Sequence, residues 1–182
     1  MQVSLDGFVS TGPNDEQKWV TWAWEEIKQD VLSLMDSTDT MIIGRKLAVD
    51  FIPYWQEVAN DSKHDMYELA IRNVQSRKII FSKTLQKAEW INTEIATGDL
   101  VDKVNSLKSQ SGKDIAVCGG SSFVASLIKN KLIDEYYFYI NPVAIGTGDQ
   151  IFNQIDDFRR LKLKRSFAYN SGLVLVHYEK EP

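Results

Sequence analysis

The chain has 182 residues, 43% of them hydrophobic and 25% charged, and these values predict a single globular domain spanning 1–182. Its 25 acidic and 21 basic side chains leave a formal net charge of −4, which argues against nonspecific binding to nucleic acid or to anionic membranes. The one cysteine, Cys118, excludes an intrachain disulfide and a cysteine-based zinc site, and it suits a reducing, cytoplasmic location. His64 and His177 have no metal-ligand spacing, and no run of about 18 apolar residues predicts a membrane span.

The first half of the chain alternates short apolar runs with amphipathic stretches. Asp6-Gly7 is a turn pair that ends the opening strand, and apolar residues at steps of three and four after Thr21 indicate a helix. The elements expected here are a strand over 1–5, a helix over 21–36, a strand over 40–43, a helix over 64–74 and a strand over 78–81.

The second half continues the alternation and ends in two β-prone runs joined by Asn170-Ser171-Gly172, which is typical of a hairpin. The elements expected here are a helix over 99–109, a strand over 115–118, a helix over 122–130, a strand over 135–140 and hairpin strands over 161–169 and 173–179. Strands separated by helices form mostly parallel sheets with both faces covered. The sequence therefore predicts a three-layer α/β/α fold with a mixed, mostly parallel central sheet and a C-terminal antiparallel hairpin.

Polar or glycine-rich clusters follow three of the predicted strands. They are Gly44-Arg45-Lys46, Ser82-Lys83-Thr84 and Gly119-Gly120-Ser121-Ser122. Ligands bind such sheets outside the carboxyl ends of the strands. The cations and hydroxyls suit phosphates, and the glycines, with a positive φ expected at Gly120, let the backbone approach an anion at the start of the next helix. The alternative interpretation is a tight glycine turn beside ordinary surface charges.

The order of several short motifs resembles a known family. The motifs are Ser4-Leu5-Asp6-Gly7, Trp19-Val20-Thr21, Asp39–Arg45, Gly119-Gly120-Ser121, Leu132–Tyr136, Pro142 and Gly146-Thr147-Gly148. Together they resemble the dihydrofolate-reductase-like superfamily, specifically the stand-alone relatives of the reductase domain of the bifunctional riboflavin-biosynthesis deaminase-reductase. The resemblance covers almost the whole chain, and it implies a mixed sheet with helices on both faces, bound NADPH and frequently a homodimer.

The resemblance also implies roles for particular residues. Trp19 and the turn at 44–47 would contact the cofactor, Ser82 and Lys83 would lie near the adenosine 2′-phosphate, and 119–125, which includes Phe123, would wrap the pyrophosphate. The chain departs from the family pattern at four places, two of which are Val117, in place of the acid usual before the glycine turn, and Asp50-Phe51-Ile52-Pro53, in place of an Asp-Asp-Pro run. Leu47 stands where many relatives have a threonine, and Met35 lies where the riboflavin reductase has an arginine. We therefore expect a retained cofactor side and a rewritten substrate side.

In a hydride transfer the nicotinamide carries the chemistry, so the protein has to position it and to deliver at most one proton. The candidate proton carriers are Asp6, Glu26 and Asp30. Asp6 is equally explained as a turn former, and Glu26 as an acid that favours the positive end of a helix. Trp22 and Trp55 are the aromatic side chains expected to line the substrate.

These features together predict an NADPH-dependent reductase of a small planar or carbonyl/imine-type substrate, similar to 5-amino-6-(5-phosphoribosylamino)uracil reductase or dihydrofolate reductase. The alternative is a non-catalytic nucleotide- or small-molecule-binding domain that kept the fold. A homodimer is also expected, because the run over 135–140 is apolar or aromatic on both faces.

Overall fold

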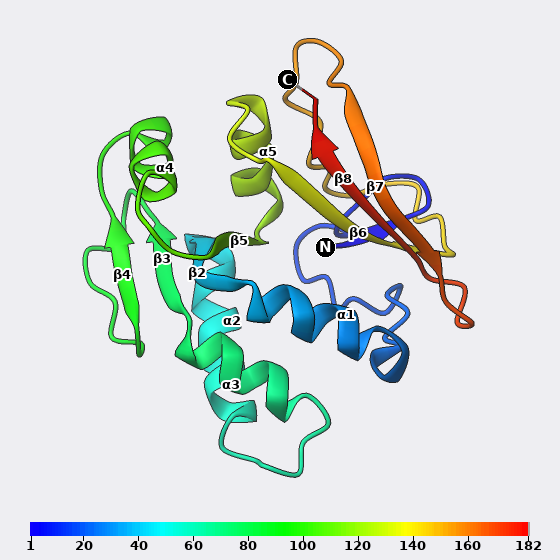
Figure 1. Ribbon diagram of the computed structural model, residues 1–182, viewed down its shortest axis with the longest axis horizontal. Coiled ribbons are helices and arrows are strands. Elements are labelled where there is room, and N and C mark those ends of the chain that lie inside the picture. The colour runs from blue at the N-terminus through cyan, green and yellow to red at the C-terminus, as the bar shows by residue number, and fades with distance from the viewer. Residues whose placement is uncertain (182) are drawn as a thin grey trace. The chain divides into compact units, whose positions relative to one another are not determined.

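The computed structural model describes residues 1–181, which form two compact units (Figure 1). The first unit holds residues 1–27 and the chain from Ser121 onward, and the second holds Lys28–Gly120. The chain passes between the units twice, and its organisation as a single domain stays a prediction. Within residues 1–181, the helices are too short or too polar to span a membrane.

The second unit is an all-parallel sheet with its connecting helices. The strands lie in the order β4-β3-β2-β5. The elements are β2 (Thr38–Gly44), α2 (Arg45–Val58), α3 (Tyr67–Gln75), β3 (Arg77–Phe81), β4 (Thr93–Ala96), α4 (Leu100–Lys108) and β5 (Asp114–Gly119). α1 (Trp24–Asp36) begins in the first unit and continues into the second. α2 and β4 were not predicted from the sequence.

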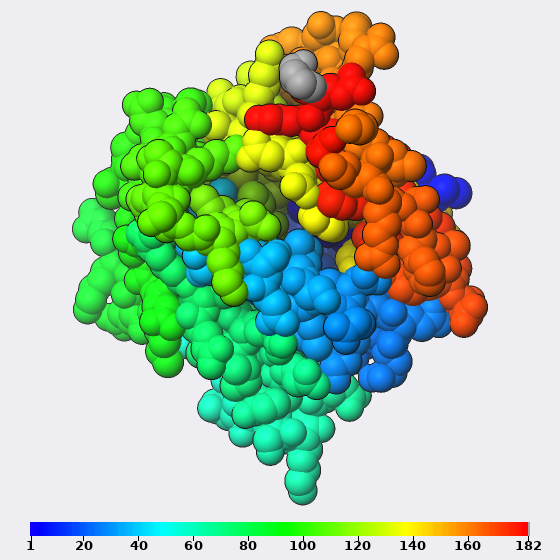
Figure 2. Space-filling view, viewed as in Figure 1, coloured from blue at the N-terminus to red at the C-terminus, as the bar shows by residue number. Residues whose placement is uncertain are grey.

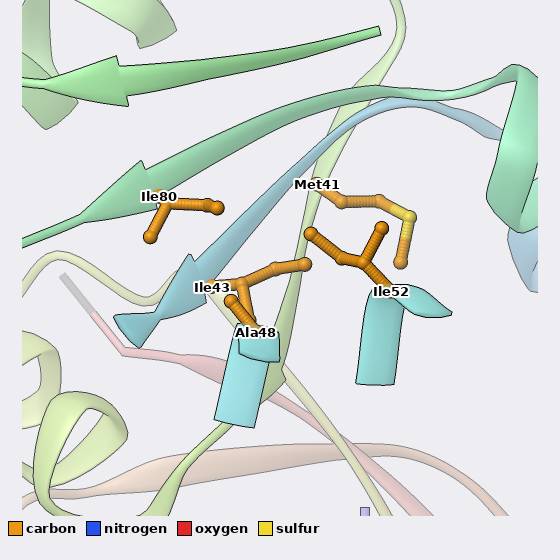
Figure 3. Packing of buried hydrophobic residues seen from close by; sticks show 5 residues of the cluster. All are labelled: Met41, Ile43, Ala48, Ile52 and Ile80. Carbon is orange, nitrogen blue, oxygen red and sulfur yellow. The ribbon is translucent and has the colours of Figure 1, made fainter. Parts of the chain in front are cut away.

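The core of this unit lies between β2, β3 and α2. Its fully buried members are Met41, Ile43, Ala48, Ile52 and Ile80 (Figure 3). β2 reads as an almost continuous apolar run, as expected of a parallel strand that is buried on both faces. Ala48 and Ile52 are four residues apart, so they lie on one face of α2 and hold this helix against the strands.

The first unit contains a mixed sheet with the strand order β1-β6-β8-β7. Its elements are β1 (Gln2–Ser4), α5 (Ser121–Lys129), β6 (Glu135–Asn141), β7 (Leu161–Ala168) and β8 (Val174–Lys180). β1 pairs with β6 in parallel, and the other two pairings are antiparallel. Figure 2 shows β7, in orange, at the surface. The α/β class, the mixed strand directions and the C-terminal antiparallel hairpin are thus confirmed.

A buried amide organises the carboxyl ends of β1 and β6. The side chain of Asn141 is fully buried beside Ser4, its register partner on β1. Its Oδ1 accepts from the Thr21 amide at 2.7 Å, and its Nδ2 donates to Gln2 Oε1 at 3.0 Å. Because a buried polar group without partners is costly, these bonds fix the segment that enters α1 against the sheet.

A buried lysine closes the C-terminal end of α3. Lys78 on β3 is 3% exposed, and its ammonium donates to the carbonyl oxygens of Ser76 at 2.7 Å, Asn73 at 2.9 Å and Val74 at 3.0 Å. These oxygens lie at the end of a helix, where carbonyl groups lack partners and a positive charge is favoured. Burial nevertheless lowers the pKa of Lys78 to about 8.

We predict that the free energy of unfolding rises with pH because of Lys78. Its pKa in the folded chain is about 8, against 10.5 for an ordinary lysine, so between these values the unfolded state holds a proton that the folded state has released. The charged form therefore destabilises the fold below pH 8, and this cost is relieved as the pH rises. Relative to Lys78→Met, the wild type should gain about 2 kcal/mol between pH 8 and pH 10 in urea unfolding.

The Lys78→Met variant is the reference because it lacks the Lys78 hydrogen bonds at every pH. It keeps all the other lysines and tyrosines, so their titration affects both proteins equally. A stability difference that stays constant over this pH range would contradict the assignment.

Candidate functional site

The parallel register brings the three polar clusters to one edge of the second unit's sheet. β2 lies between β3 and β5, with Gly44 opposite Phe81 and Ile43 opposite Gly119. The segments that leave these strands therefore start side by side at the carboxyl edge. Segments 44–46, 82–84 and 119–120 are all in this place, as a phosphate-binding site at the strand ends requires. We call this set of segments the phosphate cradle.

The first segment is the start of a helix and not only a turn. Gly44 is the N-cap residue of α2 and offers no side-chain hydrogen bond, and the first turn contains no acidic residue. Arg45 and Lys46 occupy the first two helical positions, and both are exposed. The amides at this end lack intrahelical partners and carry partial positive charge, and the two cations add to it. This helix start is therefore suited to binding an anion.

The second segment is a turn built on a serine hydroxyl. Ser82 Oγ accepts from the amides of Thr84 at 3.1 Å and Leu85 at 2.7 Å. This local bonding ends β3 and fixes the direction of the chain after it. Lys83 and Thr84 are exposed at the tip of the turn, so their ammonium and hydroxyl groups are available to a ligand.

The glycine pair at the third strand end differs in one respect from expectation. The left-handed backbone lies at Gly119, with φ +120°, and not at Gly120. A Cβ atom on Gly119 would come 3.0 Å from Leu47 Cδ2, whereas a Cβ on Gly120 would have only Leu47 Cβ near it, at 3.9 Å. Gly119 is thus required by the fold, while the space beside Gly120 is open on the protein side.

The rest of the expected phosphate-binding stretch, from Ser121 onward, lies in the first unit. Ser121 starts α5 directly after Gly120, and Ser122 and Phe123 complete its first turn, which has no acidic residue. Ser121 Oγ donates to Asp149 Oδ2 at 2.9 Å. The neighbouring thiol of Cys118 is no nucleophile at neutral pH, because burial raises its pKa to about 12.

Trp19 is held in an ordered loop of the first unit. Its indole Nε1 donates to Asp15 at 3.1 Å, and Asp15 also accepts from the amides of Thr11 and Gln17. Partial burial of Asp15 acts to raise its pKa, but hydrogen bonds from Gln17 and Trp19 outweigh it and lower the pKa. Trp22, the expected substrate contact, is about half exposed.

Asp6 and Glu26, which are among the expected proton carriers, make structural hydrogen bonds. Asp6 accepts from Ser4 Oγ at 2.6 Å and from the Gly146 amide at 2.7 Å, and these bonds lower its pKa. Glu26 accepts from the amide and the hydroxyl of Ser171 at the tip of the β7–β8 hairpin. Asp30 is half-buried on α1. The bonds of Asp6 and Glu26 give each a role in the fold, and their part in proton transfer stays a prediction.

Trp55 is not placed at the cradle edge. It lies ten residues after Arg45 on α2, about 15 Å along the helix axis. There it contacts Phe51 and Tyr54 edge to face, with ring centroids 6.0 Å and 5.1 Å away. Its role as a substrate contact stays a prediction.

Packing accounts for two of the departures from the family pattern. Leu47 and Met35 lie against the apolar core of the second unit, and Leu47 also contacts Gly119. Each apolar side chain thus fills a place where the family pattern predicted a polar or charged group. Sequence reasoning missed the helix that begins at Arg45, although Ala48 and Ile52 gave a signal at helical spacing.

Comparison with known proteins places the chain in a family. It is 30% identical over 182 residues to an uncharacterized protein, YyaP, of Bacillus subtilis (strain 168), covering 98% of this chain and 91% of that one. RibD of Acinetobacter baumannii has a similar fold, with a TM-score of 0.69, 16% identity and coverage of 100% of this chain and 57% of that one. A dihydrofolate reductase from Enterococcus faecalis, whose structure holds NADP(H), gives a TM-score of 0.58 at 12% identity and covers 100% of this chain and 94% of its own.

The TM-scores of the two solved structures show that they share a dihydrofolate-reductase-like fold with this chain. Because less than a fifth of their residues are identical to this chain, the likeness concerns the fold alone. The model of the RibD C-terminal domain family matches residues 1–175. This protein therefore belongs to the RibD C-terminal domain family.

Proposed function

We propose that this protein is an NADPH-dependent reductase of a small planar or carbonyl/imine-type substrate. The observation that carries the proposal is the alignment of segments 44–46, 82–84 and 119–120 at one edge of a parallel sheet. The family and the reductase fold of the neighbours support it. A dinucleotide phosphate needs cations, free amides and close backbone approach, and this edge has all three.

The chemistry of NADPH is hydride donation, and in this proposal the chain binds and orients the cofactor. Arg45, Lys46 and the amides at the start of α2 neutralise phosphate charge. Gly120 leaves room for the pyrophosphate, because an added Cβ there would meet no protein atom closer than 3.9 Å. In the first unit, the hydroxyls of Ser121 and Ser122 at the start of α5 are further donors for phosphate. The ammonium group of Lys83 binds the 2′-phosphate and so distinguishes NADPH from NADH.

A non-catalytic nucleotide-binding protein is the second candidate. The observation that favours it is the packing of Leu47 and Met35 against the apolar core, at positions where the resemblance implied a threonine and an arginine. Both candidates bind NADPH, and they differ in turnover. Oxidation of NADPH, followed at 340 nm with a panel of carbonyls, dihydrofolate and pyrimidine intermediates, distinguishes them.

We further propose a homodimer that forms through the surface of the first unit. Phe158, Leu163 and Phe167 are 70%, 51% and 49% exposed, and they lie on or just before the edge strand β7. A monomeric protein seldom exposes several large apolar side chains along one segment. In β6, by contrast, Tyr136 and Tyr139 are buried within the subunit.

The Gly120→Ala variant should bind NADPH at least about tenfold more weakly than the wild type, a loss of about 1.4 kcal/mol or more. The added methyl group fits the protein without a close contact or a left-handed backbone, so the melting temperature should change little. Fluorescence titration and thermal melting on one sample measure both quantities. Thr97→Ala, at the same edge after β4, is the control and should bind normally. A folded Gly120→Ala protein with wild-type affinity would contradict the cradle.

The Lys83→Ala variant should lose about tenfold in affinity for NADPH and almost nothing for NADH. The 2′-phosphate carries close to two negative charges, and one charge-assisted hydrogen bond contributes roughly 1.5–3 kcal/mol. Lys87→Ala is the matched control, because Lys87 is exposed four residues away and pairs with Glu89 at 3.0 Å. Equal losses for the two cofactors would show that Lys83 does not read the 2′-phosphate.

Light scattering at micromolar concentration should give about twice the chain mass of 20.8 kDa. The double variant Leu163→Asp, Phe167→Asp should give the monomer mass, because charges placed in an apolar contact oppose association. Ile91→Asp changes an exposed apolar residue, 58% accessible, in the other unit and should leave the dimer intact. A monomeric wild type would refute the proposal.

A further inference from the structure

An acidic side chain is bonded to the first residue of α5. Asp149 Oδ2 accepts the hydroxyl hydrogen of Ser121 at 2.9 Å. The backbone of Asp149 is also fixed, since its amide donates to Ser10 O and its carbonyl accepts from Val9 N, each at 2.9 Å. The carboxylate is therefore held in place by an isolated antiparallel bridge between Ser10 and Asp149.

Close backbone contact makes this bridge a defined structure. A Cβ on Gly148, where φ is +149°, would come within 1.9 Å of Ser10 O, so only glycine allows the two segments to meet. Ser10 Oγ then accepts from the Gly12 amide at 2.9 Å, at the start of the loop that carries Trp19. Asp149 thus connects this loop to the first turn of α5.

The position of Asp149 is electrostatically relevant to any anion at α5. The first turn of α5 contains no acid, and its amides favour a negative group. The Ser121 hydroxyl has one hydrogen to donate, and Asp149 already accepts it. A phosphate oxygen that takes this hydrogen must displace the carboxylate, and the remaining negative charge repels the phosphate.

We propose that Asp149 competes with the ligand's phosphate for the Ser121 hydroxyl and so weakens phosphate binding at the start of α5. This inference rests on the proposed function, in which the pyrophosphate of NADPH lies at the start of α5. The charge of Asp149 weakens binding of phosphate-bearing ligands, and ligand binding exchanges the Ser121–Asp149 bond for a Ser121–phosphate bond. The bound state then releases the side chain that ties α5 to the Trp19 loop.

The experiment measures binding of inorganic pyrophosphate and of NADPH by isothermal titration calorimetry at low salt. Asp149→Asn keeps an oxygen acceptor for Ser121 and removes the charge, so both ligands should bind about threefold more tightly or better. Asp149→Ala should also increase the affinity for both ligands. In the Ser121→Ala background the gain from Asp149→Asn should fall to less than half, because the shared hydroxyl is gone.

Asp156→Asn is the matched control, since it makes the same change in net charge on the same irregular segment and should leave both affinities unchanged. Unchanged or weaker binding by Asp149→Asn, the full gain in the Ser121→Ala background, or an equal gain from Asp156→Asn would each overturn the inference. If the wild type binds NADPH and Asp149→Asn binds it equally well, only this inference fails. If neither the wild type nor any variant binds NADPH or pyrophosphate, the proposed function fails with it.

Discussion

The parallel register of β2 with β3 and β5 is the constraint on which the candidate site depends. Parallel strands all finish at the same edge, so Gly44, Phe81 and Gly119 end their strands together, although they are distant in sequence. No loop separates β2 from α2, and this forces the first turn of the helix to lie at that edge. Ala48 and Ile52 then anchor the helix to β2 and β3 through the apolar core. The packing of the core thereby determines where the charged helix start lies.

The helix start at Arg45 conflicts with the usual electrostatics of helices. Acids are favoured in a first turn and cations in a last turn, yet α2 begins with two cations and has no capping side chain. In α4, by contrast, Asp99 caps the helix by accepting from the amides of Val101 and Asp102, as helix stability alone would favour. A local rule broken at one helix and kept at another indicates a functional position, because natural sequences depart from such rules mainly at their sites.

Much of the fold follows from local sequence patterns. The apolar runs over 40–43 and 78–81 and the helical spacing of apolar residues after Asp99 predicted β2, β3 and α4, because hydrophobic periodicity is a local signal. α2 was missed because Pro53 lies inside it and an interior proline normally argues against a helix.

The site was less accessible to sequence reasoning. The three strand ends could be identified one by one, since glycines and cations after apolar runs are visible in the sequence. Their alignment depends on the strand register, and the left-handed backbone at Gly119 depends on tertiary structure. Asp149 gave no signal, because its partner Ser121 is 28 residues away and the contact exists only through the bridge to Ser10.

The central claim, that NADPH phosphates bind at the carboxyl edge of the β3-β2-β5 sheet, is tested most directly by backbone amide NMR. A 20.8 kDa chain is suited to ¹H–¹⁵N correlation spectra recorded during an NADPH titration. We predict that the largest shift changes fall in 44–46, 82–84 and 119–122, while Asp39 and Asp114 near the opposite ends of β2 and β5 stay unchanged. Shift changes centred on that opposite edge, or none at millimolar NADPH, would contradict this claim.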